Sequence, residues 1–403
     1  MSPMLNETGK LVVAHLVQTY LFLTGSWIYN QISTHQEFVP IVIARRLQNL
    51  DEFPLSPDRL FHYREFIAGR SLVAAGIRRA YQALTHSRER FYTQTLQATG
   101  ARLLHAHFGP EGYLALPVKR KTGLPLVTTF YGADMSKLPR NHPAWRQRYR
   151  KLFREGDLFL CEGEHMAQQV QQLGCPPEKL RVHHLGIDVE RIAFMPRTLH
   201  AGEPVRLVMA ASFREKKGIP YAIEAFIKAY AQFPNMEFRI IGGVKDNPAE
   251  ASILQSCRSR VAHAGLESKV FFLGYLQYAN YLQEMTSAHL FLAPSVTAMD
   301  GDSEGGAPVS IIEASAAGLP VISSWHCDIP GVVLHEQSGL LVEERDADGL
   351  ADAILKMVLH PERWQSLGEA GRRHIEKEFN VFRQAHRLEA EIYDPILSRR
   401  SQL

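Results

Sequence analysis

Residues 302–322 read DSEGGAPVSIIEASAAGLPVI, and this stretch decides how the rest of the chain is interpreted. A short apolar run at 290–293 precedes it and predicts a strand. The glycine-rich segment then predicts a turn, followed by a helix that begins near Val309 and ends at Gly318. A second strand is expected at 320–323. The pattern is that of a strand-turn-helix-strand unit from a parallel sheet.

The turn of this unit has the composition of a ligand-binding loop. Pro308 suits the first helical turn, where its missing N–H has no intrahelical partner. Gly305 and Gly306 allow the backbone to approach a ligand, and the free N–H groups of a helix start attract phosphate and hydroxyl oxygens. Glu304 and Glu313 are carboxylates that suit the hydroxyl groups of a sugar and of a ribose. The alternative is an ordinary structural unit with two solvated glutamates.

Strands and helices alternate along both halves of the chain, which predicts α/β domains with doubly wound parallel sheets and ligands at the carboxyl ends of the strands. In the second half, strands are expected at 205–211, 237–242, 269–273, 289–293 and 320–323, and helices at 219–232, 248–264, 278–286 and 309–317. We therefore expect two Rossmann-like domains that face a central cleft. The first spans 1–198 and the second 205–379, with a final helical stretch at 361–397 whose end, 380–403, crosses back onto the first domain.

The size and composition are those of a globular protein. The sequence shows no paired-cysteine motif and no membrane-spanning segment. The chain has 403 residues, 45% of them hydrophobic and 22% charged, which fits two domains with their own cores. A formal charge of +3 is too small for a polybasic nucleic-acid binder, and the four cysteines lack metal-like spacing. We recognise no secretory leader and no apolar run that could span a bilayer. The expected location is the cytoplasm, including the inner face of the membrane.

The sequence EGGAP at 304–308, followed by Glu313 and the GLPV at 318–321, resembles the donor-site signature of the family 4 retaining glycosyltransferases of the GT-B fold. In that family the first Glu lies against the donor sugar and the second holds the ribose of the nucleotide. The resemblance therefore assigns these roles to Glu304 and Glu313. The spacing departs by one residue, because the usual first position falls on Gly305, so either the turn is longer here or the first Glu is displaced.

Other stretches of the second half extend the resemblance to the donor site. Lys217, before a glycine, matches the Lys of the family's cationic loop, which grips the diphosphate. The usual Arg position is held by Ser212, and Arg214 is the expected substitute. The alternative is a solvated charged loop. Further donor contacts are implied for Gly243 and for the N–H groups of Gly305, Gly306 and Ala307. The backbone of the segment at Tyr275 and Leu276 is expected to bind the base of the nucleotide.

The first half carries weaker signals of the same kind. Gly25 lies in a loop that can meet the donor diphosphate in GT-B enzymes, although an ordinary turn fits equally well. His107 belongs to a His-x-His-Phe-Gly sequence that the family often shows, and it is either catalytic or structural. Tyr131 stands where relatives commonly have His near the sugar. Asp134 can hold an acceptor hydroxyl or cap the following segment.

A basic, amphipathic helical pattern at 59–97 offers a possible membrane contact, with seven arginines between 59 and 90. A helix that packs on the sheet and leaves a solvated basic face is the alternative. Asp300 and Asp302 form an Asp-x-Asp pair, the metal clamp of a different transferase fold. Because cations are already placed for the diphosphate, no metal and no cofactor are expected.

The resemblance implies a retaining hexosyltransferase that moves a sugar from a UDP- or GDP-type nucleotide sugar to a glycan or glycolipid acceptor in surface polysaccharide synthesis. The expected partners are the donor, a glycan or lipid-linked acceptor and an anionic membrane surface, but no nucleic acid. One alternative keeps the fold and uses a soluble small-molecule acceptor. Another is a nucleotide-sugar-binding protein without turnover, which the displaced Glu304 and the Tyr131 replacement allow.

Overall fold

The structure is a computed structural model that describes residues 9–22, 25–63, 86–244 and 247–401. Its internal contacts divide the chain into two compact units. The N-terminal unit comprises Met1–Cys161, Ala167–Gly186 and Val381–Leu403. The C-terminal unit comprises Glu162–Met166 and Ile187–Asn380. Each unit is described separately below.

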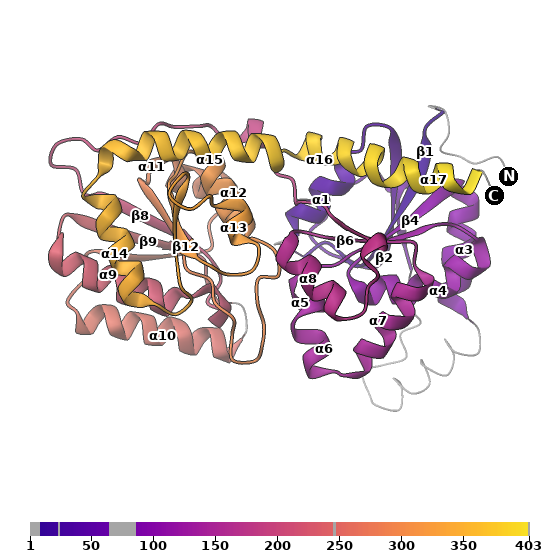
Figure 1. The fold of residues 1–403 in the computed structure, drawn as a ribbon, viewed down its shortest axis with the longest axis horizontal. Coiled ribbons are helices and arrows are strands. Elements are labelled where there is room, and N and C mark those ends of the chain that lie inside the picture. The colour runs from indigo at the N-terminus through magenta and orange to yellow at the C-terminus, as the bar shows by residue number, and fades with distance from the viewer. Residues whose placement is uncertain (1–8, 23–24, 64–85, 245–246, 402–403) are drawn as a thin grey trace. The chain divides into compact units, whose positions relative to one another are not determined.

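The N-terminal unit is built on a seven-stranded parallel sheet with the order β3-β2-β1-β4-β5-β6-β7 (Figure 1). The strands are β1 (Leu11–Tyr20), β2 (Phe38–Leu47), β3 (Leu60–His62), β4 (Ala101–His107), β5 (Leu126–Thr129), β6 (Leu158–Cys161) and β7 (Leu180–Val182). The helices are α1 (Ser26–Ser33), α3 (Ser87–Thr99), α4 (Gly109–Thr122), α5 (Gly132–Met135), α6 (Lys137–Asn141), α7 (Ala144–Glu155) and α8 (Glu164–Gln172), with short 3-10 turns at Pro57–Arg59 and Pro177–Lys179. The strand order reverses between β1 and β4, and such switch points are where open α/β sheets bind ligands.

The end of the chain completes the core of the N-terminal unit. It forms α16 (Val381–Arg387), a π-helical segment (Leu388–Tyr393) and α17 (Asp394–Ser401), which Figure 1 draws in yellow. Leu388 and Ile392 pack in one buried cluster with Val13 of β1 and Leu103 of β4. Burial of these apolar side chains attaches the C-terminal helices to the sheet.

The C-terminal unit has a six-stranded parallel sheet with the order β10-β9-β8-β11-β12-β13. The strands are β8 (Val205–Ala210), β9 (Met236–Ile241), β10 (Val270–Gly274), β11 (Leu290–Ala293), β12 (Val321–Ser324) and β13 (Gly339–Val342). The helices are α9 (Ile219–Gln232), α10 (Pro248–His263), α11 (Tyr278–Ser287), α12 (Val309–Ala316), α13 (Ile329–Val332), α14 (Ala347–Val358) and α15 (Trp364–Glu378), with 3-10 turns at Val189–Arg191, Glu215–Lys217 and Pro361–Arg363.

Both faces of this second sheet are buried. Leu207 of β8 belongs to one hydrophobic cluster, whereas Val208, the next residue, belongs to another. Successive side chains of a strand point to opposite faces, so apolar residues at both positions require helices on both sides. The expected fold class, two α/β units with doubly wound parallel sheets, is confirmed.

Two expectations about the chain path differ from the structure. Ile187, Val189 and Ile192 are buried in the core of the C-terminal unit, so residues 187–198 lie with that unit rather than with the first. The final helical stretch is interrupted at Asn380, which forms an isolated β-bridge with Ile187. The bridge between Ile187 and Asn380 joins segments far apart in the sequence, a long-range contact that local pattern does not reveal.

The prediction of a helix at 59–97 is wrong at the start of this range. Leu60–His62 form β3, which pairs in parallel with residues 42–44 of β2. Pairing at the sheet edge overrides the helical periodicity of this segment. Most of the arginine-rich stretch, residues 64–85, lies outside the described residues. Across the part of the chain that is described, no helix combines the length and apolar character that crossing a membrane requires.

Candidate active site

The first part of the candidate site is a cluster of charges at the carboxyl edge of the C-terminal sheet. β8 and β11 are paired neighbours, and the loops that follow them carry Lys217 and Glu304. The Nζ atom of Lys217 lies 2.8 Å from Oε1 of Glu304. Ser295 Oγ donates to the same oxygen at 3.0 Å, and Lys216 Nζ lies 3.4 Å from Oε2. The loop after β8 and the Glu-Gly-Gly turn, both assigned to the donor site by the resemblance, therefore come together in the structure.

Gly218, next to Lys217, packs closely against the segment that follows β11. Gly218 adopts a positive φ of 67°, and a Cβ there would collide with the carbonyl of Pro294. Glycine is the residue that reaches this conformation without steric cost. The close approach of Gly218 to the end of β11 brings Lys217 within reach of Glu304.

Buried opposite charges set the electrostatics of the cluster. Burial alone would raise the pKa of Glu304, but the ammonium groups of Lys217 and Lys216 outweigh it and hold that pKa at about 2. Burial lowers the pKa of Lys217, and the neighbouring carboxylate offsets part of that change. Arg214 pairs in the same way with Asp302, which also lies 3.4 Å from the Nζ of Lys216. The cations expected to hold a diphosphate are thus neutralised by carboxylates of the protein itself.

The turn that carries Glu304 is held by a histidine. The Glu304 N–H donates to Nε2 of His326 at 3.2 Å, so this nitrogen carries no proton. Nδ1 of His326 therefore bears the N–H that it donates to Glu344 at 2.6 Å. The next residue, Gly305, has a φ of 78°, a value that glycine adopts readily. This arrangement directs the side chain of Glu304 itself toward the lysines, despite the one-residue difference in spacing.

Glu313 occupies a separate part of the site on α12. Its carboxylate accepts from the hydroxyl of Tyr281 at 2.7 Å and from that of Tyr278 at 3.1 Å. Burial raises the pKa of Glu313, and the two tyrosine hydroxyls lower it in part. Tyr278 itself is half exposed. The two glutamates of the signature therefore have different surroundings, cationic for Glu304 and phenolic for Glu313.

The remaining donor-site candidates of this unit lie near the ends of β9 and β10. A Cβ placed on Gly243 would lie 2.9 Å from Cδ2 of Tyr275, so this glycine and the tyrosine ring are adjacent. Leu276 packs against the hydrophobic cluster that includes Val208. Leu276 therefore has a packing role, and only its backbone suits the expected contact with a base. Ala307, in the turn before α12, packs against that cluster as well.

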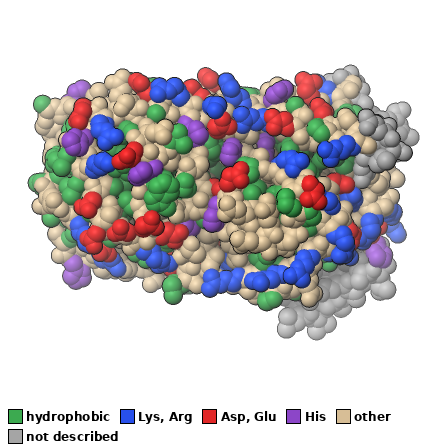
Figure 2. All heavy atoms as spheres, in the orientation of Figure 1, with side chains coloured by type: hydrophobic (Ala, Val, Ile, Leu, Met, Phe, Trp, Pro, Cys, Tyr) green, Lys and Arg blue, Asp and Glu red, His purple; other side chains and the backbone are tan. Residues whose placement is uncertain are grey.

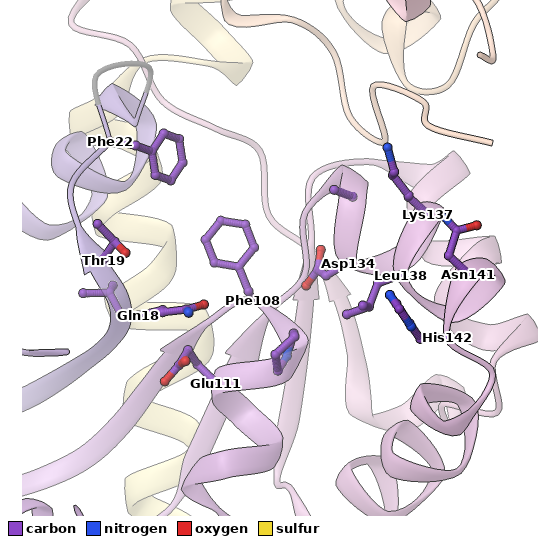
Figure 3. Close-up of a pocket in the computed structure, with 13 residues that line it drawn as sticks. Gln18, Thr19, Phe22, Phe108, Glu111, Asp134, Lys137, Leu138, Asn141 and His142 are labelled. Atoms are coloured by element: carbon purple, nitrogen blue, oxygen red, sulfur yellow. The ribbon is translucent and has the colours of Figure 1, made fainter. Parts of the chain in front are cut away.

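The N-terminal unit contains a cavity of about 460 Å³ at the ends of β1 and β4 (Figure 3). Phe22 and Phe108 supply aromatic walls, and Lys137 and Asn141 of α6 lie on the opposite side of the close-up. Asp134 also lines the cavity. Aromatic faces combined with a few polar groups are typical of small-molecule sites.

Asp134 performs the capping function that was one of its two expected roles. Its Oδ1 accepts from the N–H of Tyr131 at 2.8 Å, and its Oδ2 accepts from the N–H of Gly109 at 2.6 Å. Burial raises the pKa of Asp134 to about 7, although the two N–H groups lower it. The N–H of Gly25, another candidate, forms a local hydrogen bond to the carbonyl of Phe22 at 2.7 Å.

His107 and Tyr131, two separate candidates in the sequence, are joined directly. The Tyr131 hydroxyl lies 2.8 Å from Nδ1 of His107. Both side chains are buried, and burial lowers the pKa of His107 to about 3. His107 is therefore a buried residue in contact with Tyr131 and not an exposed acid.

Sequence reasoning missed several residues of the site. Lys216 and Asp302 were visible as charged neighbours of predicted residues, but nothing indicated that they pair. Ser295, Tyr281 and His326 carried no sequence signal, because their roles depend on which loops meet at the sheet edge. Asp302 was considered in the sequence as half of an Asp-x-Asp metal clamp. In the structure it forms ion pairs with Arg214 and Lys216.

Two doubly wound parallel units, one with lysines, carboxylates and a glycine-rich turn at the carboxyl edge of its sheet, define a glycosyltransferase-type architecture. The family model described as "Glycosyl transferases group 1" matches residues 190–374, and "Glycosyltransferase Family 4" matches residues 41–191. The chain thus belongs to the family 4 glycosyltransferases.

Named relatives and solved structures agree with this assignment. The chain is 34% identical to the amylovoran biosynthesis glycosyltransferase AmsK of Erwinia amylovora over 70% of this chain and 67% of AmsK. It is 35% identical to an Escherichia coli protein named as the colanic acid biosynthesis glycosyltransferase WcaL, over 68% of this chain and 66% of that protein. These alignments span about two thirds of the relatives' length.

The solved structures have low sequence identity and show the fold. Anabaena HepE, in a structure with UDP, aligns with a TM-score of 0.75 and 16% identity over 96% of this chain and 100% of HepE. Sucrose-phosphate synthase from Thermosynechococcus elongatus aligns with a TM-score of 0.74 and 17% identity, over 97% of this chain and 100% of that one. The fold is GT-B.

Proposed function

We propose that the chain is a retaining glycosyltransferase that moves a sugar from a UDP- or GDP-type nucleotide sugar to a glycan or lipid-linked acceptor in exopolysaccharide synthesis. The observation that carries the proposal is the cluster of Lys217, Arg214 and Glu304 at the carboxyl edge of the C-terminal sheet. The names of the relatives that act in amylovoran and colanic acid biosynthesis support the choice of pathway class.

The charge pairs of the cluster suit a diphosphate leaving group. In the structure Lys217 and Arg214 are neutralised by Glu304 and Asp302. A donor diphosphate would compete for both cations, and negative charge grows on it as the glycosidic bond opens. Glu304 would then lie beside the sugar, where positive charge develops. The cations supply the stabilisation that a metal provides in other transferases, so we propose a reaction without a metal.

The stereochemical part of the proposal is front-face attack with retention. The departing phosphate takes the proton of the acceptor hydroxyl, and no protein nucleophile is required. Glu313 holds the ribose hydroxyls in the position where Tyr278 and Tyr281 now donate to it. The cavity lined by Phe22 and Phe108 is the proposed acceptor site, since aromatic rings suit the apolar faces of sugars.

A membrane-bound acceptor is supported by basic side chains in the N-terminal unit. Helix α7 exposes Arg146, Arg150 and Arg154. Figure 2 shows Lys and Arg side chains gathered at the edge of the molecule where Figure 1 draws α6 and α7. Such a surface attracts anionic headgroups. We propose peripheral association with the inner face of the membrane.

The decisive experiment is a thermal-shift panel of UDP-, GDP- and ADP-sugars, followed by donor turnover with and without acceptor. A donor that binds the folded state raises the melting temperature in proportion to occupancy. Turnover identifies an enzyme, whereas binding without hydrolysis or transfer would show a nucleotide-sugar-binding protein. Flotation with anionic vesicles separates a membrane-associated enzyme from one with a soluble acceptor. If no nucleotide sugar stabilises the protein, the proposal is wrong.

A further inference from the structure

A continuous chain of buried hydrogen bonds runs behind Tyr131 in the N-terminal unit. The Tyr131 hydroxyl lies 2.8 Å from Nδ1 of His107, whose Nε2 lies 3.0 Å from Nδ1 of His15. Nε2 of His15 lies 3.0 Å from Nε2 of His35, and Nδ1 of His35 lies 2.9 Å from Oε1 of Glu389. These five side chains come from five separate segments of the chain.

The fold holds this chain of side chains in place. His15 is in the middle of β1 and His107 is the last residue of β4, the neighbouring strand. His35 precedes β2, and Tyr131 is the N-cap of α5. Glu389 lies in the π-helical segment at Leu388–Tyr393, and π-turns inside helices frequently mark functional positions.

The hydrogen bonds at Glu389 decide which group donates and which accepts in each of these side-chain hydrogen bonds. Its Oε1 accepts from the backbone N–H groups of Gln36, Glu37 and Phe38, at 2.9, 3.2 and 3.3 Å. Burial would raise the pKa of Glu389, but the His35 ring and the N–H groups of Glu37 and Gln36 outweigh it and lower the pKa. The carboxylate is therefore an acceptor, and Nδ1 of His35 must donate to it.

Proton counting then fixes every other bond, because a neutral imidazole carries one N–H. With its proton on Nδ1, His35 accepts through Nε2, so His15 donates from Nε2 and accepts at Nδ1. His107 in turn donates from Nε2 and accepts at Nδ1 from the hydroxyl of Tyr131. One additional proton on His35 reverses each of these bonds, and Tyr131 then accepts from His107.

We propose that His107, His15, His35 and Glu389 form a relay that sets the polarity of the Tyr131 hydroxyl. With neutral imidazoles, the Tyr131 O–H is committed to His107, so the buried Tyr131 oxygen offers only acceptor lone pairs to any further donor. This use of the relay rests on the proposed glycosyltransferase function; the hydrogen-bond order itself does not. His15, His35 and Glu389 are thus positioning residues, since they act through Tyr131.

The reversal is a balanced transfer of protons. When a hydronium ion of the solvent delivers a proton to the Tyr131 oxygen and leaves as water, the original Tyr131 proton moves to Nδ1 of His107. The Nε2 proton of His107 moves to Nδ1 of His15, and the Nε2 proton of His15 moves to Nε2 of His35. One bond to hydrogen forms and one breaks at each intermediate group, and no electrons are exchanged. His35 ends as an imidazolium beside Glu389, as the histidine of a catalytic triad does beside its carboxylate.

The same histidines could be read as a metal centre, because ring nitrogens of His15, His105 and His107 lie within 4.8 Å of one another. His105, however, bonds through Nδ1 to Tyr393 at 2.6 Å and through Nε2 to Thr129 at 2.7 Å. All six ring nitrogens therefore already have hydrogen-bond partners, which favours a relay over a metal site.

Other titratable groups face the relay from neighbouring elements. The ring of His105 lies 5.1 Å from that of His15, and the ring of Tyr393 lies 5.7 Å from that of His35. His183, which follows β7, is buried and is affected by the charge of His35. Among these described neighbours Glu389 is the carboxylate, so it is the group that stabilises a proton on His35.

The direct test is imidazole ¹⁵N NMR of the whole chain, with each histidine assigned by a His→Gln variant. At neutral pH we expect His15 and His107 as Nε2–H tautomers and His35 as the Nδ1–H tautomer. Tyr131→Phe should change the shift of Nδ1 of His107 and leave His35 in its tautomer. An Nδ1–H tautomer at His107 in the wild type, or a metal ion in the purified chain that is lost in His105→Gln, would overturn the relay.

The functional arm compares Glu389→Gln with Glu391→Gln, an exposed glutamate of the same π-helical segment. Loss of the carboxylate removes the acceptor for the Nδ1–H of His35, so the dependence of kcat/KM on pH should change in Glu389→Gln and stay as in the wild type in Glu391→Gln. Tyr131→Phe should change that dependence as well. A merely structural role would lower activity equally at every pH, and that result would overturn the assignment. If the wild type turns over no nucleotide sugar, the proposed function fails while the NMR result still decides the relay.

Discussion

Replacing Lys217 by alanine tests the donor site where its electrostatics are strongest. The pKa of Glu304 is held at about 2, against an ordinary 4.5. At about 1.4 kcal/mol per pKa unit, this difference corresponds to roughly 3.5 kcal/mol of net favourable interaction for the ionised carboxylate. Lys217 at 2.8 Å and Lys216 at 3.4 Å share it, and burial of the lysine reduces the gain. We expect Lys217→Ala to cost about 1–2 kcal/mol of unfolding free energy at pH 7.

The pH dependence of that cost has a defined sign. The folded-state pKa of Glu304 is depressed, so the stabilisation is present above pH 4.5 and is lost as the pH falls toward 2. The stability difference between wild type and Lys217→Ala should therefore shrink over this window in urea denaturation. A double-mutant cycle with Glu304→Gln isolates the coupling of the two side chains.

The catalytic consequence is measured separately as turnover of the nucleotide sugar. Loss of a cation that stabilises the leaving diphosphate should lower kcat at least about tenfold, equivalent to roughly 1.4 kcal/mol of transition-state stabilisation. Lys217→Arg, which keeps the charge, should retain more activity. Lys228→Ala is the matched control, because that lysine forms its ion pair with Asp348 on the exposed surface of α9. Full activity in Lys217→Ala would refute the diphosphate assignment.

Three further predictions follow from the described geometry. Glu313→Gln should mainly raise the donor KM and be rescued by high donor concentration, whereas Glu304→Gln should mainly lower kcat; equal effects in steady-state kinetics would contradict the two roles. The pKa of His183 is lowered from 6.5 to about 3, so the unfolded state binds a proton that the folded state refuses, and stability should fall as pH drops through this window. His183→Gln should reduce that slope by about 1.4 kcal/mol per pH unit in urea titrations. Binding to anionic vesicles should weaken with added salt and with Arg150→Glu on α7, and equal flotation with neutral vesicles would count against an electrostatic contact.

Much of the donor-site unit was predictable because its signals are local. The elements from β8 to β12 lie within a residue or two of the expected ranges, since periodicity and turn residues act between chain neighbours. Glu304 and Lys217 were both predicted to belong to the donor site, but their direct ion pair was not predicted. The tyrosines that hold Glu313 could not be predicted, because their position depends on how α11 packs beside α12.

The sequence by itself determined the two α/β units, the glycine-rich turn and the cationic loop, because these features depend on residues close together in the chain. Only the tertiary structure decided what the buried histidines do. His35 and Glu389 are 354 positions apart, and they meet because the C-terminal helices pack on the first sheet. Each histidine has an ambiguous pattern of donors and acceptors until its neighbours are known. The carboxylate at the end of the chain removes that ambiguity, and no local pattern could have supplied it.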